Sequence, residues 1–189
     1  MNLSTLWTGL CLGWVALEIW VLLRTRTTHD SGNVQDRGTL RLLWITITIS
    51  LTACGFLRPQ HLAAWHTQAA WWTPACAALL ALGLVVRLVA IVSLGKSFTA
   101  NVTTHADQKL NQSGLFAVVR HPSYLGMEII FLAIGLATRD WLCLALAVVP
   151  TTLALLRRIE VEELALRSAF GGAYDDYCQQ TRRLIPGLY

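Results

Sequence analysis

Charged side chains are scarce in this 189-residue chain. Asp, Glu, Lys and Arg make up 14% of it, whereas hydrophobic residues make up 54%. A soluble domain usually carries about 25% charged residues. The mean hydropathy is +0.50, and a soluble globule of this size has too little interior to hide that much apolar surface. The composition therefore argues against a disordered chain and an ordinary cytosolic fold, and it predicts a small integral membrane protein.

Sequence signals for a disulfide framework, a metal or a nucleic acid are also missing. Four of the five cysteines lie in apolar segments, and no Cys-x-x-Cys or Cys/His spacing indicates zinc. We expect free thiols that pack as small hydrophobes. The net charge of +4 comes without basic–aromatic interleaving, so we expect the lipid bilayer as a partner, with no metal and no nucleic acid.

The chain does contain long apolar runs, at Leu3–Leu23, Leu42–Leu57, Pro74–Leu94, Tyr124–Thr138 and Trp141–Leu156. A membrane span needs about 20 residues, so the second run is slightly short and the last two are shorter still. These two form either a tight helical hairpin or a pair that does not cross fully. The predicted fold is all-α, a polytopic membrane helical bundle of about five transmembrane helices with a cytoplasmic C-terminal helical tail, in a single domain over residues 1–189.

The distribution of Lys and Arg predicts the orientation. With five spans, one side receives twelve of these residues and the other receives two, Arg58 and Arg139. Cytoplasmic loops carry the excess of Lys and Arg in membrane proteins. We therefore expect an integral membrane protein, in the inner or plasma membrane if the source is bacterial, with its amino terminus outside and its active site on the cytoplasmic face.

Three ionisable residues, Glu18, Arg87 and Glu128, fall within the predicted spans. Such groups are costly in lipid and tend to face the protein interior or a wet cavity. The sequence leaves open whether they form a structural pair or belong to a site.

Polar residues gather first between the third and fourth runs, where the segment ends in RHPSYLGM, Arg120 to Met127. Pro122 suits the first turn of a helix, so His121 is expected near a helix cap. A helix start offers free N–H groups and partial positive charge, which suit a carboxylate or a ribose oxygen.

A second polar cluster follows the fifth run. No Gly or Pro interrupts the chain from Arg157 to Phe170, so the fifth helix is expected to continue until Gly171 and Gly172 end it. Arg158 and Glu162 are four residues apart, as are Glu163 and Arg167, so each pair can meet on one helix face. The side chains of Glu162 and Glu163 point about 100° apart around the helix, so the two carboxylates are expected to have different roles.

Together these residues resemble the isoprenylcysteine carboxyl methyltransferase family and its phospholipid methyltransferase relatives. The resemblance covers about Gly95 to Pro186, roughly half the chain. Its motifs are LGKSF at 94–98, SGLF at 113–116, VRHPSYLG at 119–126, EE at 162–163, FGGAYDDY at 170–177 and TRRLIP at 181–186. The resemblance implies an S-adenosylmethionine (SAM) donor, released as S-adenosylhomocysteine, and a lipophilic acceptor such as a prenylcysteine carboxylate. It divides the chain into three spans over residues 1–94 and a SAM-binding catalytic half over residues 95–189.

The resemblance also implies roles for individual residues. Arg158 would face the acceptor, and Glu162 and His121 would join it as the catalytic group. The SAM pocket would be lined by Asn101, Gln108, Lys109, Leu110, Asn111, Phe116, His121, Pro122, Ser123, Tyr124 and Glu162. Gln108 stands where the family has His, and Phe116 stands where it has Tyr. Gln108 can still hydrogen-bond but carries no charge, and Phe116 lacks the hydroxyl.

Other readings stay open. The tail also resembles NADPH-dependent sterol reductases, although the Glu162–Glu163 pair argues against them. A phospholipid amine N-methyltransferase and a non-catalytic membrane scaffold would suit the same fold. The sequence alone does not identify the acceptor or decide between O-, N- and S-methylation.

Overall fold

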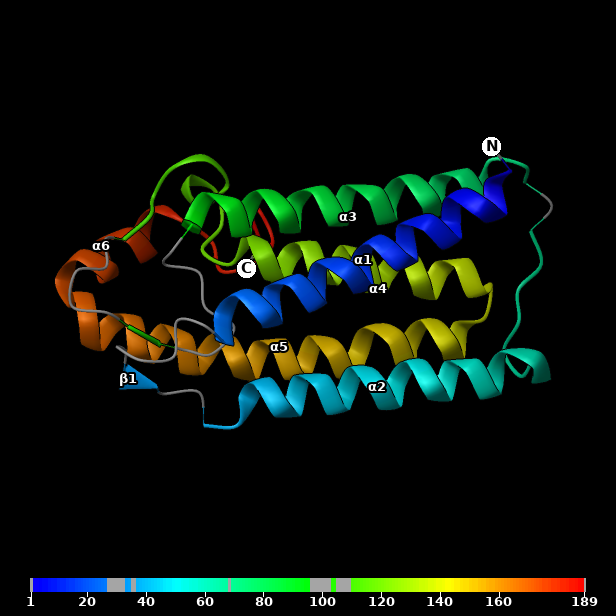
Figure 1. Cartoon of the computed structure of the whole chain (residues 1–189), viewed down its shortest axis with the longest axis horizontal. Coiled ribbons are helices and arrows are strands. Elements are labelled where there is room, and N and C mark those ends of the chain that lie inside the picture. The colour runs from blue at the N-terminus through cyan, green and yellow to red at the C-terminus, as the bar shows by residue number, and fades with distance from the viewer. Residues whose placement is uncertain are drawn as a thin grey trace.

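A computed structural model describes residues 2–26, 33–34, 37–67, 69–95, 103–104 and 110–188. The described part is a bundle of long helices with two very short paired strands (Figure 1). The elements are α1 (Leu3–Arg26), β1 (Asn33–Val34), α2 (Thr39–Leu57), the 3-10 turn η1 (Arg58–Gln60), α3 (Trp72–Leu94), β2 (Thr103–Thr104), the 3-10 turn η3 (Gly114–Ala117), α4 (Pro122–Thr138), α5 (Trp141–Phe170) and α6 (Gly172–Gln180).

Four of these helices are long and apolar enough to cross a membrane. They cover Leu3–Leu23, Thr39–Gln60, Trp72–Leu94 and Trp141–Phe170, and α4 is a shorter apolar helix. The second run is therefore longer than expected, because the helix starts at Thr39. α4 has 17 residues, about 25 Å at 1.5 Å per residue, and is the one element of the five that stays shorter than a usual span. The predicted helical membrane bundle is confirmed.

Successive long helices run in opposite directions along the long axis of the bundle (Figure 1). The amino terminus lies at one end, and α6 with the carboxyl-terminal tail lies toward the other. α4 and α5 form a tight hairpin, one of the two arrangements that the sequence left open, and are joined through Arg139 and Asp140. α2 packs on α5, whereas α1 packs on α3 and α3 on α4. Helices from both halves of the sequence thus surround the hairpin.

The end of the bundle that holds the α4–α5 turn is tied to the loop after α2. Asp140 caps α5 by accepting hydrogen bonds from the N–H groups of Leu142 (2.9 Å) and Cys143 (3.0 Å), and its second oxygen accepts one from Ala63 N–H at 3.1 Å. The N–H of Cys143 is the largest cause that holds the pKa of Asp140 below its usual range, and the N–H groups of Ala63 and Leu142 act in the same direction. The aspartate therefore fixes both the start of α5 and the preceding loop.

Close approach of α3 and α4 depends on two glycines that face each other. A Cβ at Gly83 would lie 2.8 Å from the Gly126 carbonyl oxygen, and a Cβ at Gly126 would lie 2.7 Å from the backbone nitrogen of Arg87. Small residues at a helix interface let the backbones approach in this way. The contact holds the amino-terminal half of α4 firmly on α3.

α5 is the longest helix, with 30 residues, or about 45 Å. It continues past the apolar run as expected and ends at Gly171, whose φ of 53° is in the left-handed region that favours glycine. Its second half carries Arg158, Glu162 and Glu163 beyond the apolar core.

Candidate functional site at the start of α4

The first turn of α4 carries several of the predicted site residues. His121 is its N-cap residue and Pro122 occupies the first turn, as expected. The N–H of His121 donates to the Arg183 carbonyl at 3.0 Å, and those of Tyr124 and Leu125 both donate to the His121 carbonyl at 3.1 Å. The expectation that this helix start offers free N–H groups is therefore wrong for these three amides, because the tail and the turn itself use them.

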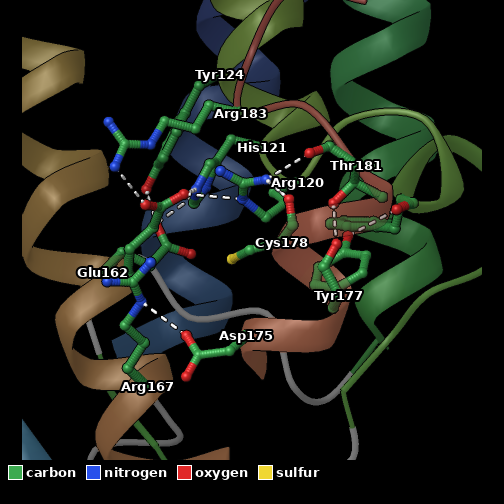
Figure 2. Close-up of polar contacts among 12 residues, drawn as sticks. Arg120, His121, Tyr124, Glu162, Arg167, Asp175, Tyr177, Cys178, Thr181 and Arg183 are labelled. Carbon is green, nitrogen blue, oxygen red and sulfur yellow. Dashed lines mark hydrogen bonds and ion pairs between the residues drawn. The ribbon is translucent and has the colours of Figure 1, made fainter. Parts of the chain in front are cut away.

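The Tyr124 hydroxyl links α4 to the two charged residues predicted on α5. It accepts a hydrogen bond from Arg158 Nε at 2.8 Å. It also donates one to Glu162 Oε2 at 2.7 Å (Figure 2). Arg158 is 3% exposed, whereas the Glu162 side chain is 32% exposed. Arg158 and Glu162 thus meet on one face, as expected, with a tyrosine hydroxyl between them. The buried guanidinium is held in place and the carboxylate still reaches solvent.

Glu163 points to a different set of partners. Its Oε1 accepts from Arg120 Nε at 2.9 Å and lies 3.4 Å from His121 Nε2, and its Oε2 lies 2.9 Å from Arg183 Nη2. Glu162 and Glu163 therefore have different contacts, as their divergence on the helix predicts. The spacing also allowed Glu163 to pair with Arg167, but Arg167 pairs with Asp175 at 3.3 Å.

His121 lies between the two carboxylates. Its Nδ1 is 3.8 Å from Glu162 Oε2, and its Nε2 is 3.4 Å from Glu163 Oε1. The imidazole also stacks on the Tyr124 ring, with centroids 5.6 Å apart and planes 12° apart. His121 is 4% exposed, so its ring is almost completely enclosed by these neighbours.

The carboxyl-terminal tail is bonded to the chain just before α4. Val119 and Arg182 form a parallel bridge, and Arg120 N–H donates to the Arg182 carbonyl at 2.8 Å. The Arg120 side chain also donates from Nη1 to the Thr181 carbonyl at 2.6 Å (Figure 2). The tail thus fixes the backbone on which His121 sits.

Phe116, predicted to line the pocket, is buried and contacts α6. Its carbonyl accepts a hydrogen bond from the Tyr177 hydroxyl at 2.6 Å. Burial raises the pKa of Tyr177 to about 12, so this phenol stays protonated and remains a donor at neutral pH. The structure therefore shows Phe116 in contact with α6 through its backbone.

Two residues that the sequence reasoning did not assign also reach the site. Thr39, the first residue of α2, is 4% exposed, and its Oγ1 accepts from Arg158 Nη1 at 3.2 Å. Arg87 of α3 donates from Nη1 to Ser123 Oγ at 2.9 Å. A threonine at a helix start gives no sequence signal for such a contact, and Arg87 was noticed only as a charge in a span.

The remaining predicted pocket residues are only partly covered. Asn101, Gln108 and Lys109 lie outside the described residues. Leu110 is half-buried, and Asn111 donates from Nδ2 to the Ser93 carbonyl at the end of α3 at 3.2 Å. Asn111 therefore fixes the loop to α3, and its place in a pocket stays a prediction.

These features define a polytopic helical membrane protein with a buried arginine and two carboxylates gathered at the polar end of its bundle. The family model described as isoprenylcysteine carboxyl methyltransferase matches residues 76–168, which include α4 and the charged part of α5. The chain belongs to this family.

Named relatives agree with the match to this family model. The chain is 36% identical over 114 residues to a probable protein-S-isoprenylcysteine O-methyltransferase of Oryza sativa subsp. indica, covering 57% of this chain and 58% of that protein. It is 26% identical to protein-S-isoprenylcysteine O-methyltransferase A of Arabidopsis thaliana, covering 85% and 82%. The chain thus spans less than two thirds of the length of the rice relative.

The fold is also similar to a solved structure, that of the eukaryotic intramembrane Ras methyltransferase ICMT. The TM-score is 0.61 at 27% identity, and the match covers 76% of this chain and 52% of that one.

Proposed function

We propose that the chain is an SAM-dependent methyltransferase that transfers a methyl group to a lipophilic acceptor, with the carboxylate of a prenylcysteine-like molecule as the preferred class. The observation that carries this proposal is the Arg158–Tyr124–Glu162 chain. It places a buried cation and a partly exposed carboxylate within one hydrogen-bonded group, where the apolar part of the bundle ends. The names of the relatives support the reaction class.

The charges of the site suit SAM, which supplies an electrophilic methyl group on a sulfonium and carries an ammonium and a carboxylate. Glu162 keeps a partly exposed carboxylate that can accept from the ammonium, because one oxygen is already bonded to Tyr124 and 32% of the side chain is exposed. Arg183, 34% exposed and paired with Glu163, brings a cation to the same place for the carboxylate of the donor. Tyr124 and His121 add stacked ring faces beside them.

Arg158 is assigned to the acceptor. Tyr124 and Thr39 hold its Nε and Nη1, so the guanidinium is orientated before any substrate arrives. A planar guanidinium matches a carboxylate in shape and charge. Methyl transfer to a carboxylate needs no general base; it needs alignment of the nucleophile and exclusion of water. Burial of Arg158 supports both requirements.

The orientation in the membrane is part of the same proposal. The bias of Lys and Arg toward the end of the bundle that carries α6 and the tail supports a cytoplasmic site and an external amino terminus. A cytoplasmic site would meet a water-soluble donor on one side and a membrane-borne acceptor on the other.

The test is to incubate the purified protein in lipid nanodiscs with methyl-labelled SAM and, separately, a farnesylated cysteine with a free carboxylate, the same molecule as its amide, and a phospholipid amine. We expect label only with the free carboxylate. The product should release labelled methanol in mild base, because a methyl ester hydrolyses there and a methylated amine or thioether does not. Base-stable label, or label in the phospholipid, would overturn the assignment of the acceptor.

Matched variants tie the activity to the site. Arg157→Ala is the control for Arg158→Ala, because Arg157 is the preceding residue on α5 but is 58% exposed and pairs with Glu160 on the surface. Activity should survive the first change and be lost with the second. NADPH added without SAM serves as the control for the reductase alternative. In calorimetry it should give no binding heat above that of a buffer injection.

A further inference from the structure

An ion pair between α1 and α3 lies inside the apolar part of the bundle and involves neither carboxylate of the site. Arg87 of α3 donates from Nε to Glu18 Oε1 of α1 at 2.5 Å and from Nη2 to Glu18 Oε2 at 2.7 Å. Both residues are 4% exposed. A single charge would be costly in lipid, and the two-pronged contact neutralises both groups. The ion pair by itself explains why α1 carries a glutamate.

The rest of the Arg87 guanidinium is used on α4. Nη1 donates to both the side-chain oxygen and the carbonyl oxygen of Ser123, at 2.9 and 3.2 Å. Ser123 is in the first turn of α4 and is 7% exposed. The Gly83–Gly126 contact brings the backbone of α3 close enough to make this possible. One arginine therefore joins α1 and α3 to Ser123, which directly precedes Tyr124 and follows His121 by two positions.

The opposite side of this turn is held by the tail. His121 N–H donates to the Arg183 carbonyl at 3.0 Å, so the turn is fixed by the tail from the polar end and by Arg87 from the membrane interior. Tyr124 is the residue that aligns Arg158 and Glu162. A small shift of this turn would therefore move the Tyr124 hydroxyl relative to both charged groups, and misplacement by about 1 Å can cost about a hundredfold in rate.

We propose that Arg87 and Ser123 are positioning residues: the Glu18–Arg87 ion pair, acting through Ser123, fixes the first turn of α4 so that Tyr124 aligns the site. Ser123 on this account contacts Arg87 instead of the methyl donor, although the resemblance placed it in the SAM pocket. The inference rests on the proposed function for its effect on catalysis, and its structural part stands without it.

Ser123→Ala tests the proposal with little damage to the bundle. It removes the side-chain oxygen only, and Arg87 keeps both contacts with Glu18 and the contact with the Ser123 carbonyl. Ser123→Thr keeps the oxygen and serves as the rescue variant. Ser50→Ala is the matched control, because Ser50 is also a buried serine (3% exposed) but lies on α2, which packs on α5.

Three quantities are measured for each variant: SAM affinity, the single-turnover rate of methyl transfer with saturating acceptor, and hydrogen exchange of the amides between Val119 and Met127. For Ser123→Ala we expect a rate about tenfold lower, exchange about tenfold faster in this segment and SAM affinity within about twofold of the parent. Ser123→Thr should restore the rate, and Ser50→Ala should match the parent in all three.

Weaker SAM binding with an unchanged rate would overturn the proposal, because that pattern identifies Ser123 as a ligand of the donor. Unchanged exchange in Ser123→Ala would overturn it as well, whatever happens to activity. If the parent protein transfers no methyl group, the function proposed above fails, and the exchange comparison still decides whether Arg87 and Ser123 fix the turn.

Discussion

Removing only the Tyr124 hydroxyl should lower the free energy of unfolding of the protein as well as disturb its site. In Tyr124→Phe, Arg158 loses the acceptor at 2.8 Å and Glu162 loses the donor at 2.7 Å. The loss at Glu162 should be small, because its side chain is 32% exposed and water can replace the hydroxyl. Arg158 is 3% exposed, and leaving a buried donor without its partner costs about 1–3 kcal/mol. We expect the free energy of unfolding to fall by about that amount.

A double-mutant cycle separates this contact from general packing. In a parent that carries Arg158→Ala, the guanidinium is gone and Tyr124→Phe should cost less than about 0.5 kcal/mol, because the interaction that it removes is no longer there. The assay is equilibrium unfolding of all four proteins in one detergent, followed by helical circular dichroism. An equal loss in both backgrounds would refute the reasoning, since it would show that the hydroxyl does not act through Arg158.

The remaining predictions concern the donor, the α5 cap and the orientation. Glu162→Gln should weaken SAM binding by about 1–3 kcal/mol in calorimetry, whereas Glu160→Gln, a surface glutamate 54% exposed, should leave it unchanged; equal losses would remove Glu162 from the donor site. The lowered pKa of Asp140 means that its ionised form stabilises the fold above the pKa of an unfolded aspartate and that this stabilisation is lost as pH falls through the lower folded pKa. The melting temperature should therefore fall less on acidification in Asp140→Asn than in the parent, and an identical pH dependence would contradict the role of the carboxylate. For orientation, an impermeant thiol reagent on intact cells should label Asn2→Cys and spare Leu188→Cys, each made in a background with the native cysteines replaced; the reverse pattern would show that the tail is outside.

The sequence predicted the helices well because its apolar runs are long and the residues that end or separate them are clear. The long α5 follows from the unbroken stretch after the fifth run, and its end follows from Gly171. The hairpin follows from Arg139 and Asp140, which are the only polar break between two apolar runs. α2 was judged short because Thr39 and the residues after it are less apolar than the rest of the helix.

Part of the site could be predicted because its residues lie close together on one helix. The spacing of Arg158 and Glu162 placed them on a common face, and the helix period separated Glu163 from Glu162. The sequence did not show that a tyrosine hydroxyl would join the first two, since that depends on how α4 packs against α5. For the same reason it did not indicate that Thr39 would reach Arg158.

Local reasoning failed where a distant segment competes for the same group. The N–H of His121 looked free at a helix start but donates to the carbonyl of Arg183, more than sixty positions along the chain. Arg167 is spaced to pair with Glu163 but contacts Asp175, because Glu163 is already bonded to Arg120 and Arg183. These contacts follow from the path of the tail, which no periodicity in the sequence specifies.

The most direct test of the central claim compares SAM affinity with single-turnover methyl transfer in Arg158→Ala and Arg157→Ala. The proposed site predicts that Arg158→Ala binds SAM nearly as well as the parent and transfers the methyl group far more slowly, because an aligning contact acts mainly at the transition state. Arg157→Ala should match the parent in both quantities. If Arg158→Ala loses SAM binding as severely as Glu162→Gln, Arg158 supports the donor pocket and the assignment of donor and acceptor to separate residues is wrong.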